Sequence, residues 1–250
     1  MRVTLLTAGL LLESQAPTVT QHLDDIIVSL DGPPEIHDRI RGLPRTFERL
    51  ARGVSALRLL RPEMPIQARC TVQKENHHYL RETVRAAREL DLNSISFLAV
   101  DVTSEAFNRP EGWPAERQSR VALDASQVES LDDEVEALIQ DCRREIASGF
   151  VAEDEEKLRR IVLHFRTLLG QAQPIAPRCN APWVSAVVES DGTVRPCFFH
   201  PPLGNLNAHP LYEIVNSPEA LRFRRHLDVA TNPICRRCVC SLFLPDAKGV

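Results

Sequence analysis

The sequence has no cysteine before Cys70, few aromatic residues and no long apolar run. A membrane-spanning helix needs about 20 consecutive apolar residues, and the longest candidate, residues 5–12, is interrupted by Thr7 and Gly9. The charge is nearly balanced, with 30 basic and 34 acidic residues, and no basic block is interleaved with aromatic side chains. The composition therefore argues against a membrane protein and against nucleic acid as a partner.

Cysteine is concentrated at the other end of the chain, where five of the seven cysteines fall within residues 179–240. A chain of 250 residues buries a sizeable core without disulfides. An odd number of cysteines and a cramped C-x-x-C-x-C cluster also argue against a disulfide scaffold. We therefore expect a reducing, cytoplasmic compartment. The alternative, a short secretory signal in the first residues, lacks a small-x-small cleavage site.

The N-terminal part alternates between two hydrophobic patterns. Residues 3–6, 26–30, 66–72 and 94–100 are short runs rich in Val, Ile, Leu and Thr, which predicts buried strands. Residues 47–60 and 80–90 carry apolar side chains at a spacing of three to four, which predicts helices. This alternation predicts parallel strands joined by helices, the α/β class.

Beyond residue 106 the pattern becomes helical and then changes again. Residues 128–146, which include Cys142, and residues 158–169 each predict an amphipathic helix, and a proline-containing boundary follows near residue 176. We therefore expect three domains: 1–106, 107–176 and 177–250. Cys70, in a predicted strand, and Cys142, on an apolar helix face, are expected to be small buried hydrophobic residues.

The last domain opens with a predicted β-hairpin. Residues 184–188 and 193–195 flank Ser190-Asp191-Gly192, in which Asp-Gly is a strong turn signal. The hairpin would set Cys179 and Cys197 near its two ends. Residues 210–216 and 218–227 predict short helices that lead to Cys235, Cys238 and Cys240.

These cysteines have the spacing of a metal site. Cys235 and Cys238 form a C-x-x-C pair, and Cys179 and Cys197 offer a second pair, so four thiolates are available for an iron–sulfur cluster. The same four residues suit a tetrahedral structural Zn²⁺. A third reading makes them ordinary reduced thiols. His200 is not expected to be a ligand, because thiolates already fill four places.

The spacing also resembles a known family. Twelve residues separate Cys179 from Gly192 and four separate Gly192 from Cys197, before Cys235 and Cys238 follow. This pattern, with the stretch CNAPWVSAVVESDGTVRPC, resembles the SPASM/twitch auxiliary-cluster domain of radical S-adenosylmethionine (SAM) enzymes. The resemblance implies one auxiliary [4Fe-4S] cluster, because only Cys240 follows Cys238. Cys240 would be a spare thiol, a substitute ligand or a remnant of a second site.

The N-terminal half is similar to the middle of the radical SAM partial (βα) barrel. Thr7-Ala8-Gly9 resembles the third-strand signature of that family, and Ser29-Leu30-Asp31-Gly32-Pro33 resembles its fourth-strand segment. The resemblance implies that Ser29 and Arg69 contact the ribose and carboxylate of SAM. The plainer alternative makes Ser29 a strand-end residue and Arg69 a solvated side chain. No catalytic residue can be chosen from the sequence.

Two features of the family are missing from this sequence. It has no C-x-x-x-C-x-x-C triplet and no glycine-rich GGEP-type stretch. On the resemblance the sequence begins at the family's third strand, so we expect an exposed barrel edge that a missing N-terminal half or a partner chain would cover. SAM would be a cofactor only if that part is supplied, and we do not expect this chain to cleave SAM alone.

The function implied by the resemblance is that of the C-terminal portion of a radical SAM/SPASM enzyme. In such an enzyme the auxiliary cluster assists radical modification of a peptide or small metabolite. The alternatives are a non-catalytic iron–sulfur protein for electron transfer or partner binding, and a zinc-stabilised structural module.

Overall fold

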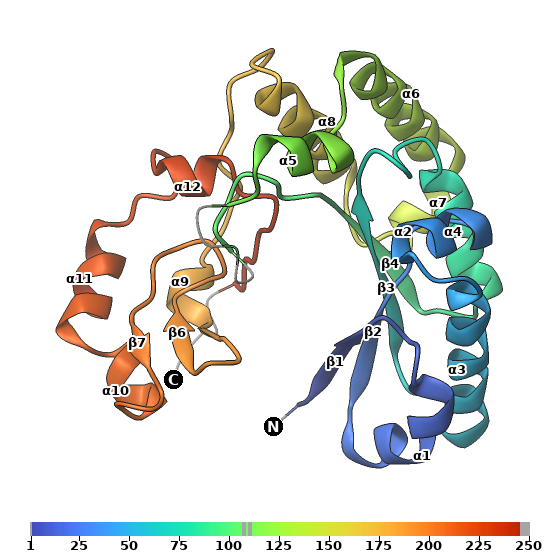
Figure 1. The fold of residues 1–250 in the computed structure, drawn as a ribbon, viewed down its shortest axis with the longest axis horizontal. Coiled ribbons are helices and arrows are strands. Elements are labelled where there is room, and N and C mark those ends of the chain that lie inside the picture. The colour runs from blue at the N-terminus through green and yellow to red at the C-terminus, as the bar shows by residue number, and fades with distance from the viewer. Residues whose placement is uncertain (1, 107–108, 110–111, 246–250) are drawn as a thin grey trace. The chain divides into compact units, whose positions relative to one another are not determined.

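The computed structural model describes residues 2–106, 109 and 112–245 (Figure 1). The chain divides into two compact units: unit 1 is Met1–Val100 with Ser119–Gln171, and unit 2 is Asp101–Gln118 with Ala172–Val250. The expected division into three domains stays a prediction, and its first boundary adjoins residues outside the described ranges.

Unit 1 is built on four parallel strands in the order β1-β2-β3-β4. The strands are β1 (Thr4–Thr7), β2 (Asp25–Ser29), β3 (Ile66–Val72) and β4 (Ser94–Ala99). Each lies within one residue of its predicted run, so the α/β class is confirmed. Within the described residues the sheet is open rather than closed into a barrel, and β1 pairs only with β2.

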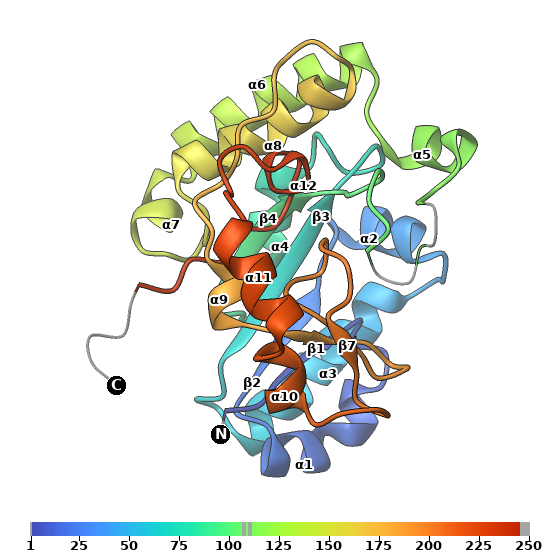
Figure 2. The ribbon, with the colours of Figure 1, turned by 90° about the vertical axis from the view of Figure 1, so that its left-hand side faces the viewer.

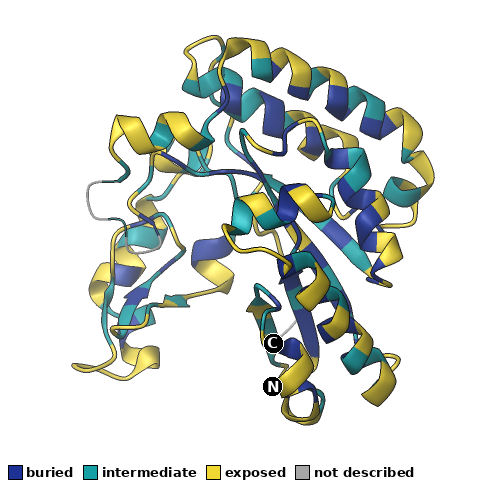
Figure 3. Ribbon diagram, turned by 45° about the vertical axis from the view of Figure 1, so that its right-hand side comes forward, coloured by how far each residue is buried: buried dark blue, intermediate teal, exposed yellow. Residues whose placement is uncertain are grey.

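Burial varies from residue to residue along the strands of this sheet (Figure 3). In β3 the side chains of Ile66, Ala68, Cys70 and Val72 are at most 1% exposed, whereas the three residues between them are partly or fully exposed. Successive side chains of a strand point to opposite faces. One face therefore forms the core of unit 1 beneath the helices, and the burial expected for Cys70 is confirmed.

Four helices connect these strands and cover the buried face (Figure 1). They are α1 (Leu12–His22), α2 (Pro34–Arg41), α3 (Thr46–Leu60) and α4 (Leu80–Glu89). The apolar spacing predicted α3 and α4, but α1 and α2 were not predicted. Helix α1 packs closely on α3.

The predicted helix of residues 128–146 is divided in two. Helix α6 (Ala125–Asp141) begins at a capping box formed by Asp124 and Gln127 and packs on α4 and α8 (Glu155–Leu168). Cys142 ends α6 and precedes α7 (Arg143–Ala147). Its backbone leaves the helical conformation there, so Cys142 is half-buried, and the expectation of a buried side chain was wrong. Helix α5 (Ala115–Val121) lies earlier in the chain.

The described residues of unit 2 include a small antiparallel sheet and several short helices (Figure 2). The hairpin expected around Asp191-Gly192 joins β5 (Val187–Val188) to β6 (Thr193–Arg195). Gly192 has φ +85°, a conformation that favours glycine. Val184 belongs to a helix rather than to the predicted strand, because Pro182 lies in a first turn that favours helix. The elements are α9 (Ala181–Val184), β5 (Val187–Val188), β6 (Thr193–Arg195), β7 (Gly204–Asn205), α10 (Leu211–Val215), α11 (Pro218–His226) and α12 (Pro233–Arg236).

The predicted short helices at residues 210–216 and 218–227 are present as α10 and α11. No helix among the described residues is long and apolar enough to cross a membrane.

Candidate functional site

The cysteines of unit 2 come from three segments, each fixed by local backbone structure. Cys179 precedes α9, and its sulfur accepts the Ala181 N–H at 3.5 Å. Cys197 follows β6, and the backbone N–H groups of the two residues after Phe198 are hydrogen-bonded to its thiol. Such N–H donors suit thiolate sulfur, which accepts hydrogen bonds more strongly once it is charged.

The third segment is α12 and the turn after it. Asn232 caps this helix, because its Oδ1 accepts the N–H groups of Ile234 and Cys235 at 3.0 and 3.1 Å. The Cys238 N–H donates to the Cys235 carbonyl at 3.1 Å, which closes the C-x-x-C turn. The Cys238 thiol donates to the Cys240 carbonyl at 2.6 Å. The cap and the turn thus fix the backbone positions from which the Cys235 and Cys238 side chains project.

The thiols lie near enough to one another to interact electrostatically. Burial raises the pKa of Cys197, and the neighbouring Cys179 thiol raises it further. Burial raises the pKa of Cys235 to about 11, with added contributions from Cys197 and Cys179. The pKa of Cys238 is also raised, by burial first and then by Cys240, Cys197 and Cys179. The thiols predicted to be ligands therefore influence one another's ionisation within unit 2, and their role as ligands stays a prediction.

The chemistry of this group fits an iron–sulfur cluster. It supplies soft thiol donors and N–H groups directed at sulfur, and such clusters are usually held by four thiolates. A single Zn²⁺ needs its donors within about 2.3 Å of one point. In the described part of the chain, no three Cys, His, Asp or Glu side chains converge closely enough to hold one ion.

One histidine also lies at this group. His200 is 2% exposed, and its Nε2 is 3.3 Å from the Cys235 sulfur. Burial lowers the pKa of its imidazole. Its ring stands edge-on to Phe223, with the ring centroids 4.9 Å apart. In the sequence, only the position of His200 three residues after Cys197 linked it to the cysteines. That position did not reveal the contact with Cys235.

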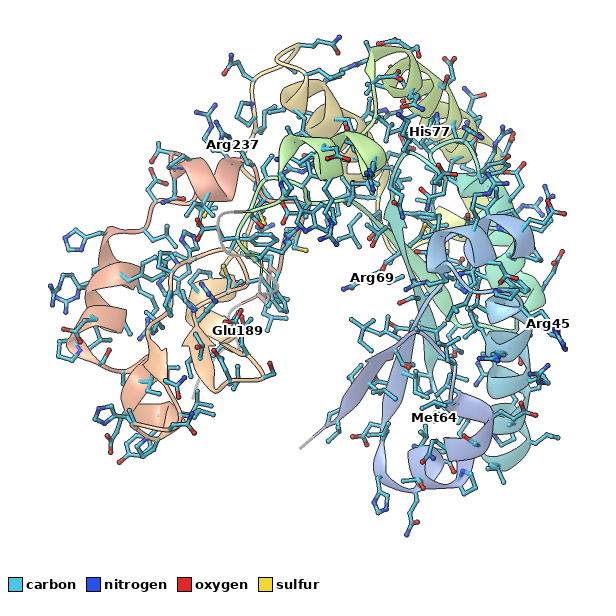
Figure 4. All side chains as sticks on the ribbon, in the orientation of Figure 1. Arg45, Met64, Arg69, His77, Glu189 and Arg237 are labelled. Carbon is cyan, nitrogen blue, oxygen red and sulfur yellow. The ribbon has the colours of Figure 1, made fainter. Side chains whose placement is uncertain are left out.

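The two residues expected to contact SAM are neighbours in unit 1. Ser29, the last residue of β2, is paired in register with Arg69 of β3, and Arg69 is paired in turn with Ser96 of β4. The Arg69 Nε donates to the Ser96 hydroxyl at 3.2 Å. Figure 4 shows Arg69 projecting from the sheet on the side away from α3 and α4. Residues 40 positions apart in the sequence thus form one polar row.

A buried polar network holds the segment that follows β2. The Asp31 N–H donates to His37 Nδ1 at 3.2 Å, and the Asp31 carboxylate lies 2.6 Å from Arg41 Nη2. Asn76 donates to the Asp31 carbonyl at 2.9 Å. Burial lowers the pKa of His37 to about 4, so its ring is neutral at pH 7 and its contact with the Asp31 carboxylate is not an ion pair. Burial also raises the pKa of Asp31.

Sequence reasoning missed a carboxyl group close to Arg69. After Val151 pairs with Ile95, the Glu153 carboxylate accepts the Phe97 N–H at 2.8 Å. Burial raises the pKa of Glu153 to about 7, although the Phe97 N–H and the positive charge of Arg69 oppose the rise. Glu153, at the edge of the sheet, is therefore a group that can exchange a proton near neutral pH.

Comparison with known proteins agrees with this geometry. Residues 179–239 match the family model of SPASM, an iron–sulfur cluster-binding domain. The chain is 26% identical over 229 residues to an AdoMet-dependent heme synthase of Methanosarcina barkeri (strain Fusaro / DSM 804). That alignment covers 89% of this chain and 62% of the relative.

Two solved structures share the fold. Native anSMEcpe with bound AdoMet and Kp18Cys peptide has a TM-score of 0.57 and 20% identity, over 89% of this chain and 59% of that one. Streptococcus suis SuiB bound to precursor peptide SuiA has a TM-score of 0.55 and 11% identity, over 97% and 55%. This chain therefore spans about three fifths of the length of the relatives it matches.

These findings confirm the resemblance seen in the sequence. Residues 179–239 are of the SPASM iron–sulfur cluster-binding type. The chain as a whole is similar to the heme synthase in sequence and to anSMEcpe and SuiB in fold.

Proposed function

We propose that this chain is the auxiliary-cluster portion of a radical SAM/SPASM enzyme. One [4Fe-4S] cluster would be bound by Cys179, Cys197, Cys235 and Cys238. The observation that carries the proposal is the group of mutually interacting thiols within the segment that matches SPASM. When bound, such a cluster accepts, stores or passes an electron, or ligates a substrate. The proposed compartment is reducing and cytoplasmic, where thiols stay available as cluster ligands.

The polar row of unit 1 is proposed to bind SAM. The Arg69 guanidinium is suited to a carboxylate, to which it can donate two parallel hydrogen bonds, and Ser29 offers a hydroxyl to the ribose on the adjacent strand. The backbone network of Asp31, His37 and Asn76 would hold the end of β2 in place. Glu153, whose carboxyl interacts with the charge of Arg69, would exchange a proton near neutral pH.

SAM cleavage would depend on a polypeptide that supplies the C-x-x-x-C-x-x-C triplet absent from this sequence. The free edge of β1 is the proposed docking position, because an unpaired strand edge offers N–H and C=O groups to an added strand. The substrate would be a peptide or a small metabolite. Structures of anSMEcpe and SuiB contain peptides, and the heme synthase relative favours the metabolite.

The test is the content of iron, zinc and acid-labile sulfide per chain after anaerobic purification. The parent should contain about four iron and four sulfide, and Cys179→Ala and Cys235→Ala should lose most of both. Cys142→Ala is the matched control, because Cys142 belongs to unit 1, and it should retain the cluster. Cys240→Ala decides whether that residue is a ligand or a spare thiol.

About one zinc per chain without sulfide would replace the proposal with a structural zinc site. A purified chain that contains neither iron nor zinc would show that the cysteines are ordinary thiols.

A further inference from the structure

His200 touches two parts of the cysteine group that are distant in sequence. Its ring nitrogen reaches the Cys235 sulfur, 35 residues away, at 3.3 Å. Its backbone N–H, with that of Phe199, is hydrogen-bonded to the Cys197 thiol. Its carbonyl accepts from Arg195 Nη1 at 3.1 Å. The residue is thus fixed from several directions between β6 and α12.

The burial of the imidazole makes this contact significant. A ring that is 2% exposed has almost no access to water, and buried polar nitrogen atoms in proteins are nearly always hydrogen-bonded. Phe223 packs edge-on against the ring and restricts its rotation. The hydrogen-bonding partner of His200 Nε2 is the Cys235 sulfur.

The protonation state of the sulfur decides which atom donates. A free thiol carries a proton and can donate to an imidazole nitrogen. A thiolate bound to iron carries none, so the neutral ring must have its proton on Nε2 and donate it to the sulfur. The contact therefore becomes an N–H···S hydrogen bond when Cys235 is a cluster ligand.

We propose that His200 is a positioning residue that donates a hydrogen bond from Nε2 to the Cys235 thiolate and raises the reduction potential of the cluster. The inference rests on the proposed cluster function. Reduction adds negative charge to the cluster, and a hydrogen bond to a ligand sulfur stabilises that charge, which is one of the factors that set the potential.

The experiment compares reduction potentials in the anaerobically purified full chain. His200→Phe keeps an aromatic ring but removes the donor, whereas His200→Gln retains an N–H donor. His209→Phe is the control, because His209 belongs to the same unit and its side chain is 67% exposed. Phe223→Leu separates ring packing from hydrogen bonding. The readout is the midpoint potential, followed by EPR during a redox titration, together with iron and sulfide content.

His200→Phe should lower the equilibrium constant for one-electron reduction about tenfold, a fall of about 59 mV in potential. His200→Gln should recover most of that change, and His209→Phe and Phe223→Leu should stay near the parent. A full cluster with the parent's potential in His200→Phe overturns the proposal. A His200→Gln potential as low as that of His200→Phe also overturns it.

Pulsed EPR of the parent with ¹⁵N-labelled histidine gives a second, independent readout if His200→Phe does not hold a cluster. A weak nitrogen coupling that disappears in His200→Gln supports the hydrogen bond. A strong coupling, which indicates iron ligation, or no coupling overturns it. A parent chain without iron and sulfide overturns the proposed function as well, whereas a loaded parent with any of the contrary results overturns the role of His200 alone.

Discussion

At the edge of β4, the Glu153 side chain makes a hydrogen bond that the backbone of a neighbouring strand would normally make. The chain leaves the sheet after Val151, and the Glu153 carboxylate accepts the Phe97 N–H that the next backbone carbonyl would otherwise receive. A backbone donor at the edge is thereby satisfied by a side chain. The cost is a carboxyl group held partly out of water, which favours its neutral form.

This residue should give the protein a measurable pH dependence. The pKa of Glu153 is raised from 4.5 to about 7 on folding, so between these values the folded state holds a proton that the unfolded state has released. Stability therefore falls as the pH rises from 4.5 to 7. Glu153→Gln keeps an acceptor for Phe97 but cannot ionise. Its Tm should exceed the parent's only slightly at pH 5 and by clearly more at pH 8, at about 2–4 °C per kcal/mol.

Thermal unfolding followed by circular dichroism at both pH values makes the measurement. Glu156→Gln, in the exposed first turn of α8, is the matched control and should show no such difference between pH 5 and pH 8. A Glu153→Gln protein no more stable than the parent at pH 8 would show that the carboxylate is well accommodated.

The sequence identified the residues whose chemistry is carried by local spacing. The cysteines were found from C-x-x-C and the hairpin turn, and Ser29 and Arg69 from family resemblance. Their roles as ligands and SAM contacts stay predictions. Glu153 and the contact of His200 could not be found in this way, because their partners are 56 and 35 residues away. Such contacts depend on strand register and tertiary packing, which no local pattern encodes.

At the scale of single elements, helix α1 shows how a local signal can hide a helix. Leu12, Ala16 and Val19 are buried at helical spacing, but Pro17 lies within the helix and resembles a break. The helix forms because its apolar side packs on α3, where the absence of a side chain at Gly53 allows close approach. Tertiary packing thus outweighs the local effect of proline.

Gly53→Ala should therefore destabilise unit 1. A Cβ at this position would lie 2.5 Å from the Leu12 Cβ, so the two helices would have to separate. Alanine favours a helix over glycine by about 1 kcal/mol, but overpacking of this kind costs about 1–3 kcal/mol. We expect a net loss of up to about 2 kcal/mol, measured by urea denaturation.

Ser55→Ala is the matched control, because Ser55 lies on the same helix and is exposed. It should be neutral or slightly stabilising. A Gly53→Ala protein that is more stable than the parent would contradict the close packing of α1 on α3.

At the scale of the whole molecule, the two units differ in how they are stabilised. Unit 1 has a core that spans a sheet and several helices. Unit 2 has strands of two or three residues, and its buried apolar residues are few and mostly small. Apart from prolines, those among the described residues are Val102, Ala106, Ala181, Val194, Ile214 and Ala220. A unit with so small a core needs additional stabilisation, such as a bound metal or disulfides.

Removal of the cluster should therefore unfold unit 2 and spare unit 1. Because metal binding contributes directly to folding in small metal-dependent domains, the cluster-free chain should lose hydrogen-exchange protection across residues 172–245. Protection of β2 and β3 should remain. Hydrogen exchange with and without the cluster makes the comparison, and Cys235→Ala should reproduce the cluster-free pattern. Equal protection of unit 2 in both states would contradict this dependence.

The alternation of faces in β3 also restricts how this sequence can change in length during evolution. Arg69 is exposed only because it stands an odd number of positions from the buried Ile66 and Cys70. Insertion or loss of one codon between Ile66 and Arg69 would turn the guanidinium towards the helices and a hydrophobic side chain towards the polar row. Homologous genes should therefore vary in length at the turns between elements and keep the spacing within this strand constant.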